Sequence, residues 1–256
     1  MRINLIGAGR LATNLGMALM GAGHKIETVY SRTLASADAL AQRLGAVATT
    51  DLAEVCSEAD VSIISVSDAA LADVVAGVTK GRRQQTFLHT AGSMPMAVFE
   101  DHAEKYGVLY PMQTFSKERI VDFSEIPVFI EASDNAVMTS VELLASSISG
   151  NVRRLSTADR KYLHLAAVFA CNFANHCYAL AEQILAEHGL PFDVMLPLTD
   201  ETARKVHVLS PRKAQTGPAV RYDENVIDMQ ARLLEEHPEM RDIYLQMSQS
   251  IHKLSK

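Results

Sequence analysis

The most constraining feature of the sequence is a glycine-rich segment, Gly7-Ala-Gly9-Arg-Leu-Ala12, directly after the apolar run Ile3–Ile6. It matches the pattern G-x-G-x-x-A between a strand and a helix. There the first glycine permits a tight turn, the second lets the backbone approach a pyrophosphate, and a small third residue lets the helix pack on the sheet. The start of the helix favours an anion. The segment predicts a dinucleotide site; the alternative is a glycine turn without a ligand.

Around this segment, the first half of the chain alternates between short β-rich runs and helical stretches, a pattern typical of βαβ units and a mostly parallel sheet. The sequence predicts strands at 3–6, 26–30, 61–66, 86–89, 108–110, 127–130 and 152–155. It predicts helices at about 10–21, 33–44, 51–57, 69–78 and 134–148. The expected fold class is α/β, with an N-terminal Rossmann domain, doubly wound around a mostly parallel sheet, and an all-α C-terminal domain.

The second half of the chain reads as helical. Ser156-Thr-Ala-Asp159 has the spacing of a helix start, and no stop signal follows until Gly189-Leu-Pro191. A helix of about 30 residues would be about 45 Å long. Further helices are expected at about 192–209, 223–236 and 239–253. We therefore expect a dinucleotide-binding Rossmann domain over 1–155 and a helical substrate or dimerisation domain over 156–256.

Composition excludes several classes of protein. A net charge of −6 disfavours a general nucleic-acid binder, which needs a basic face. No apolar run is clean enough to span a bilayer, because the nearest, Leu165–Ala181, is interrupted by polar residues. The three cysteines form no CxxC pair, as expected of reduced thiols, and the N-terminus lacks the apolar core of a signal peptide. We expect a cytoplasmic globular protein without nucleic-acid or membrane partners.

The choice of dinucleotide is read at the end of the second strand, where NAD-preferring domains place an acid. Here the residues are Ser31-Arg32-Thr33, without an acid. The two hydroxyl groups and the planar Arg32 guanidinium suit a 2′-phosphate, so the segment favours NADP over NAD. In the alternative interpretation, Ser31 or Thr33 only caps the next helix and Arg32 is a solvated surface charge.

Two later strand ends face the same crevice. Val66 and Ser67 are expected beside the nicotinamide ribose, with Asp68 capping the next helix, and His89 is a candidate proton donor or a structural residue. Tyr110 to Gln113 form either a crevice wall or a loop packed under the helical domain. The predicted cofactor-binding residues are Gly7, Gly9, Arg10, Leu11, Ala12, Ser31, Arg32, Thr33, Val66 and Ser67.

Six segments that occur in order carry a family resemblance: GAGRLATNLG, VYSRT, SVSDAAL, LHTAGSMP, LYPMQTFS and TGPAVRYD. Together they resemble the Rossmann-like proteins with a helical C-terminal domain of uncharacterised function, which are named as NADP oxidoreductases. In plan these are similar to pyrroline-5-carboxylate reductase and, more distantly, to the β-hydroxyacid dehydrogenases. The resemblance covers essentially the whole chain. It implies an NADP-binding domain, a helical domain that pairs two subunits, and an active site between domains.

The sequence departs from both better-known relatives. β-Hydroxyacid dehydrogenases carry a Lys-x-x-x-Asn pair on the interdomain helix, whereas here Lys161 is followed four residues later by Leu165, and Asn172 is preceded by Val168. The Ser/Thr/Gly-rich helix start that pyrroline-5-carboxylate reductases place around their substrate is also missing. Neither activity therefore transfers to this chain from the resemblance.

The long helix carries the second set of candidate site residues. His164, Asn172 and His176 lie on one stripe at multiples of four residues, within surroundings that are apolar nearly all round, as expected of a buried helix. A buried Asn172 must find hydrogen-bond partners, either in the neighbouring domain or on a substrate. No metal site is expected, because asparagine is a poor ligand. Small residues on this helix would also permit close packing in a homodimer.

Two hypotheses follow. In the first, the protein is an NADP(H)-dependent oxidoreductase acting on a small carbonyl, hydroxy acid or imine; His89 or His164 supplies the proton and Asn172 orients the substrate. In the second, it is a non-catalytic NADP-binding or structural dimeric protein with a vestigial active site.

Overall fold

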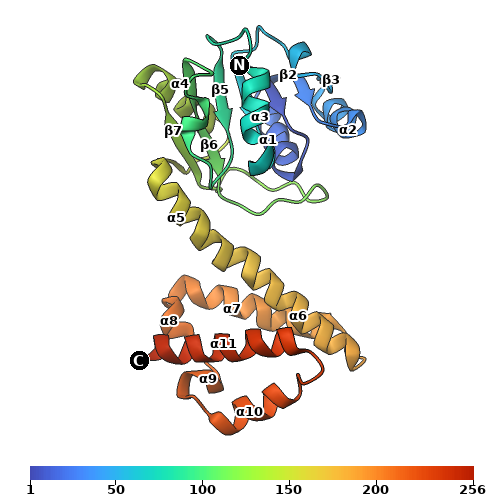
Figure 1. Ribbon diagram of the computed structural model, residues 1–256, viewed down its shortest axis with the longest axis vertical. Helices are drawn as coiled ribbons and strands as arrows, with labels where there is room; N and C mark the ends of the chain where they lie inside the picture. The colour runs from blue at the N-terminus through green and yellow to red at the C-terminus, as the bar shows by residue number, and fades with distance from the viewer. The chain divides into compact units, whose positions relative to one another are not determined.

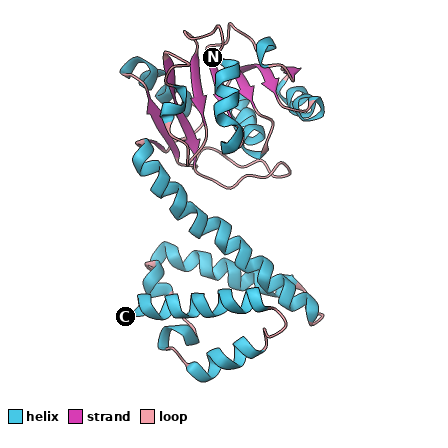
Figure 2. Cartoon of the chain, viewed as in Figure 1, coloured by secondary structure: helices cyan, strands magenta, loops and turns pink.

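A computed structural model describes residues 1–256, and the chain divides into two compact units, Met1–Asn172 and Phe173–Lys256 (Figure 1). The domain boundary predicted at 155 falls where the sheet ends, and it stays a prediction. The first unit also includes the start of the long helix. Within the second unit every element is helical (Figure 2).

The first unit is built on an eight-stranded sheet in the order β3-β2-β1-β4-β5-β6-β7-β8. All neighbouring strands are parallel except β6 and β7. The strands are β1 (Arg2–Ile6), β2 (Lys25–Tyr30), β3 (Val47–Thr49), β4 (Val61–Ile64), β5 (Thr86–His89), β6 (Lys105–Pro111), β7 (Val128–Ala132) and β8 (Val152–Arg154). The predicted fold class is confirmed. Only β3, a short edge strand, was not predicted.

Helices cover both faces of this sheet. On one face, the core joins β1, β2 and β4 to α1 (Arg10–Gly21), α2 (Leu34–Leu44) and α4 (Asn135–Ser146). On the other face, α3 (Asp68–Val78) forms part of a separate cluster, and α5 (Thr157–Ala167) begins over β6 and β7. Fully buried strand residues such as Leu5 and Ile63 each contribute about 2 kcal/mol of burial energy.

Two local predictions need correction. The helix expected over 51–57 is a single 3₁₀ turn, η1 (Leu52–Glu54): Asp51 caps it by accepting a hydrogen bond from the N–H of Ala53, but no further turn follows. Asp68 was expected to cap α3, but it is the first residue of that helix. Its carboxylate instead accepts a hydrogen bond from the Ser93 hydroxyl, which ties α3 to the loop after β5.

The long helix begins as predicted, because the Ser156 hydroxyl accepts from the N–H of Asp159. It continues from α5 through a π-helical segment, η3 (Val168–Phe173), into α6 (Ala174–Glu187). The expectation that this helix is buried is wrong for the single chain: Leu165 is 54% exposed, and Asn172 is exposed as well.

The remaining helices are η2 (Met96–Phe99) in the first unit and, in the second, η4 (Phe192–Met195), α7 (Leu196–Val208), α8 (Pro211–Ala214), α9 (Pro218–Arg221), α10 (Glu224–Arg232) and α11 (Pro238–Ser255). None of the helices in the chain combines the length and the hydropathy needed to cross a bilayer.

Candidate functional site

A cleft of about 640 Å³ lies at the carboxyl ends of the parallel strands. The loops after β1, β2, β4, β5 and β6 all contribute to it, as expected where ligands bind an open α/β sheet. Eight of the ten predicted cofactor-binding residues line this cleft: Gly7, Gly9, Arg10, Leu11, Ser31, Arg32, Val66 and Ser67. Sequence reasoning missed several other lining residues, including Ser36, Gly92 and Lys117.

The two glycines of the motif meet different physical demands. Gly7 has a φ of +124°, and a Cβ there would lie 2.1 Å from the carbonyl oxygen of Ser65 at the end of β4. Gly9 is the N-cap of α1, where no side chain caps the helix, and a Cβ there would meet nothing within 4 Å. The first glycine lets two strand ends approach, and the second leaves room beside free helix N–H groups. These residues fit a pyrophosphate.

The other two predicted residues lie outside the cleft. Ala12 is fully buried in the core under α1, which is the packing role that the motif assigns to its last position. Thr33 is the N-cap residue of α2 and donates a hydrogen bond of 2.9 Å to the Ser36 hydroxyl, and Ser36 lines the cleft. Arg32 lines the cleft beside them, is exposed, and forms no salt bridge within the chain.

A second cleft of about 580 Å³ adjoins the first. It shares Arg10, Leu11, Tyr110, Gln113 and His164 with the first cleft and extends along α5 and η3 as far as Asn172. Most of its other lining is apolar. His164 thus lies at the junction of two cavities, and Asn172 lies at the far end of one of them.

The predicted stripe on the long helix is only partly brought together. His164 and Asn172 both line the second cleft, whereas His176 lies in the other unit and is exposed. The π-helical segment between them widens the turn and shifts later residues around the helix axis. No group of three or more His, Cys, Asp or Glu side chains is placed to hold a metal ion.

Tyr110 and His164 form a pair at the junction of the clefts. The Tyr110 hydroxyl lies 3.1 Å from Nδ1 of His164, and the two rings meet edge to face. Burial raises the pKa of Tyr110, so its hydroxyl stays protonated at neutral pH. Gly92 makes this arrangement possible, because a Cβ there would lie 2.5 Å from Nδ1 of His164.

A buried ion pair fixes the start of α5, and with it His164. The Arg160 guanidinium is 1% exposed; it donates to Glu131 on β7 at 2.5 Å and to the carbonyl oxygen of Met94 at 2.7 Å. Thr157 donates to the same carboxylate from its N–H and its hydroxyl. Burial raises the pKa of Glu131, but these hydrogen bonds outweigh it and hold the pKa below its usual value. Because His164 follows Arg160 by four residues, the pair also positions its ring.

His89 does not reach either cleft. Its side chain is fully buried, stacks on Phe99 at 5.7 Å, and accepts a hydrogen bond at Nδ1 from the N–H of Ala91. Burial and, secondarily, the nearby Arg160 charge lower the pKa of His89 to about 4. The placement of His89 at the crevice edge is therefore corrected: its side chain points into the core. Of the two candidate proton donors, only His164 lines a cleft.

The buried His89 should make stability depend on pH. A folded-state pKa of about 4 against 6.5 in the unfolded chain means that the unfolded state binds the extra proton first. Stability is then greatest above pH 6.5 and falls by about 2 kcal/mol between pH 7.5 and pH 5. Urea unfolding at pH 7.5 and pH 5 measures this loss, which His89→Gln should reduce; His24, whose pKa burial also lowers, contributes to the pH dependence in both proteins. An equal loss in the free energy of unfolding between pH 7.5 and pH 5 in both proteins would contradict this assignment. Protonation of Glu131 lowers stability only below about pH 4.5, outside this window.

Comparisons with known proteins identify the family. A Rossmann-like domain matches residues 1–112, and the domain of unknown function DUF2520 matches residues 126–251. A candidate NADP oxidoreductase from Bacteroides fragilis is 55% identical, with 98% of each chain covered and a TM-score of 0.96. This chain belongs to the family that joins a Rossmann-like domain to a DUF2520 domain. The family resemblance predicted from the sequence is confirmed.

More distant structures share the fold. An imine reductase from Myxococcus stipitatus, solved with NADP⁺, is 17% identical over 100% of this chain and 93% of its own, with a TM-score of 0.68. A pyrroline-5-carboxylate reductase from Coxiella burnetii is 18% identical over 99% and 96%, with a TM-score of 0.58. A search of curated proteins finds no match to the chain.

Proposed function

We propose that this protein is an NADP(H)-dependent oxidoreductase that acts on a small carbonyl, hydroxy acid or imine. The observation that carries the proposal is the Tyr110–His164 pair, which lies where the dinucleotide cleft opens into a second, mostly apolar cleft. Membership of the same family as the Bacteroides fragilis protein, a candidate NADP oxidoreductase, supports the choice of cofactor.

The proposed cofactor site uses both ends of the first cleft. The start of α1, with Gly9 and the free N–H groups that follow it, binds the pyrophosphate. Arg32, Ser31 and Ser36 bind the 2′-phosphate, and the unpaired Arg32 guanidinium offers it a bidentate contact. When bound, the nicotinamide supplies or accepts a hydride.

Residues of the chain itself donate the proton to the substrate. The Tyr110 hydroxyl is protonated at neutral pH and faces the shared cavity, so it or the hydrogen-bonded His164 donates a proton to the substrate heteroatom. The apolar wall of Ala166, Ala167 and Ala170 accommodates a hydrocarbon body, and Asn172 offers an orienting amide. We therefore assign proton donation to the pair and substrate orientation to Asn172.

We also propose that the protein is a homodimer through its helical unit. In that unit, Leu196, Leu198 and Val208 on α7 are 50%, 63% and 81% exposed in the single chain. Several large apolar side chains exposed on one helix are typical of a surface that binds a partner. Sedimentation equilibrium tests the proposal, and a monomer at micromolar concentration would refute it.

The cofactor assignment is tested by thermal shift and titration with NADPH and NADH. Arg32→Ala should weaken NADPH binding about 10- to 100-fold, the value of a lost charge-assisted hydrogen bond, and leave NADH binding unchanged. Arg43→Ala, an exposed arginine in the last turn of α2, is the matched control. Equal shifts in melting temperature from both cofactors in the wild type would reject the NADP preference.

The catalytic assignment has its own test. NADPH binding without oxidation by any ketoacid, aldehyde or cyclic imine would favour a non-catalytic NADP-binding protein.

A further inference from the structure

The segment between β6 and β7, residues 112–127, forms a strap that contributes to both clefts. Its base is closed by a hydrogen bond of 2.9 Å from the N–H of Met112 to the carbonyl oxygen of Pro127. Phe123 is 3% exposed and stacks on Phe115 at a centroid distance of 5.7 Å, which secures the arms of the strap to the core. These contacts leave the tip, residues 117–120, to be held by something else.

A single buried side chain holds that tip. Asn14 on α1 is 0% exposed, and its amide nitrogen donates to the carbonyl oxygen of Ser116 at 2.7 Å, while its amide oxygen accepts from the N–H of Val121 at 3.0 Å. These two hydrogen bonds bridge the residues on either side of the tip. The second amide hydrogen binds the carbonyl oxygen of Arg10 at 2.9 Å. Every bond that the amide needs when buried is therefore made.

Asn14 adds little to the stability of α1 itself, so its role is better explained by its contacts with the tip. Asparagine is a poor helix former, and a buried amide gains little net stability over an apolar side chain of similar size. An aliphatic residue at this buried position could not hydrogen-bond two backbone groups of another segment. The amide thus specifies where the tip lies in relation to the first turn of α1.

The tip carries a cation into the dinucleotide cleft. Lys117 directly follows Ser116, whose carbonyl accepts the hydrogen bond from Asn14. Lys117 lines the cleft together with Gly7, Gly9 and Arg10. It is exposed and forms no salt bridge within the chain. An ammonium group without an internal partner, on a segment held at a defined place, is suited to a phosphate ligand.

We propose that Asn14 is a positioning residue that holds the strap so that Lys117 binds a phosphate of the bound dinucleotide. The inference rests on the proposed function, because it requires NADP(H) in the cleft, and it adds a cationic contact that the glycine motif does not contain. Asn14 joins the two sides of that contact, since the same amide binds the first residue of α1 and both ends of the tip.

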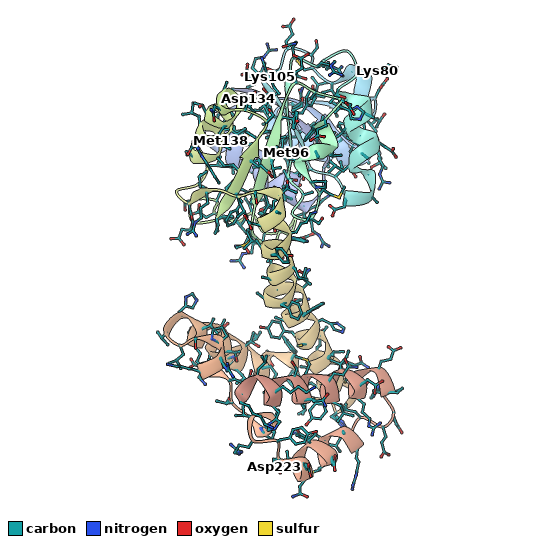
Figure 3. The ribbon with its side chains drawn as sticks, turned by 60° about the vertical axis from the view of Figure 1, so that its left-hand side comes forward. Lys80, Met96, Lys105, Asp134, Met138 and Asp223 are labelled. Carbon is teal, nitrogen blue, oxygen red and sulfur yellow. The ribbon has the colours of Figure 1, made fainter.

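The test is a double-mutant cycle on NADPH affinity, measured by calorimetry at low ionic strength. Lys117→Ala and Asn14→Ala should each weaken binding about 10-fold, and the double variant should be no weaker than either single variant. Lys105→Ala is the control, because Lys105 begins β6 at the opposite end of the sheet (Figure 3). Wild-type affinity in Lys117→Ala, or additive losses in the double variant, would overturn the inference.

Two further measurements keep the result unambiguous. Melting temperature shows whether Asn14→Ala is folded; if it is not, Asn14→Asp, which keeps the size and the acceptor of the Val121 N–H but loses the donor to Ser116, replaces it in the cycle. A wild-type protein that fails to bind NADPH would reject the proposed function itself, whereas tight wild-type binding with unchanged variants rejects only the role of the strap.

Discussion

Replacing Gly7 with alanine is expected to lower the melting temperature by about 10 °C. The new Cβ would lie 2.1 Å from the carbonyl oxygen of Ser65, and the φ of +124° is a conformation that L side chains rarely adopt. Strain and overlap of this kind cost about 3 kcal/mol or more, which is a large part of the stability of a typical domain. The overlap is not easily relieved, because the Ser65 carbonyl and the Cα that carries the new Cβ both belong to the backbone at adjacent strand ends.

Gly9→Ala is the matched variant that separates folding from binding. Gly9 has a φ of −80° and open space where its Cβ would be, so the variant should melt within about 2 °C of the wild type. Its methyl group would occupy the space that we assign to the pyrophosphate, and NADPH binding should weaken about 10- to 100-fold. Thermal unfolding and NADPH titration of both variants provide the comparison. A Gly9→Ala protein that binds NADPH normally would argue against the assigned phosphate position.

Removing the Tyr110 hydroxyl is expected to lower kcat about 100- to 10,000-fold while leaving NADPH affinity unchanged. Tyr110→Phe keeps the ring that packs against Phe129 and removes only the group that bonds His164. The magnitude is that of a lost general acid. Tyr106→Phe, on the same strand and outside both clefts, is the control. The measurement is NADPH oxidation with the most active compound of the carbonyl and imine panel.

Gly92→Ala tests the same pair without touching either side chain. Its Cβ would lie 2.5 Å from Nδ1 of His164 and 3.0 Å from the Tyr110 ring, so the pair must separate. We expect a loss of kcat that approaches that of Tyr110→Phe, because the hydroxyl is then present but misplaced. Full activity in Gly92→Ala, or in Tyr110→Phe, would remove the pair from the mechanism and leave another residue of the shared cavity as the proton donor.

The buried Glu131–Arg160 pair gives the site its rigidity. The guanidinium is 1% exposed, and Glu131 and the Met94 carbonyl accept hydrogen bonds from its two terminal nitrogens, while its Nε has no partner. Figure 3 labels Met96, whose N–H also donates to Thr157 at the start of α5. The sheet, the loop after β5 and the first turn of α5 are thus tied at one point, one helical turn before His164.

Local chemistry in the sequence determined much of the fold. The Gly7–Ala12 motif, the strand–helix alternation and the Ser156 cap each depend on neighbours within a few residues, so their consequences could be predicted without the tertiary structure. The same holds for the lining of the cleft by Ser31 and Arg32, which follow the end of β2 as the motif requires.

Only the tertiary structure decided the site beyond the motif. Whether His89 faces the crevice or the core depends on its phase on β5, because adjacent strand residues point to opposite faces, and a strand end does not reveal that phase. Tyr110 and His164 are 54 positions apart, and their contact requires α5 to begin over β6, which the Glu131–Arg160 ion pair enforces. Asn14 and the tip of the strap are joined in the same way by a contact between distant segments. Such contacts arise from packing between elements, and no local pattern in the chain encodes them.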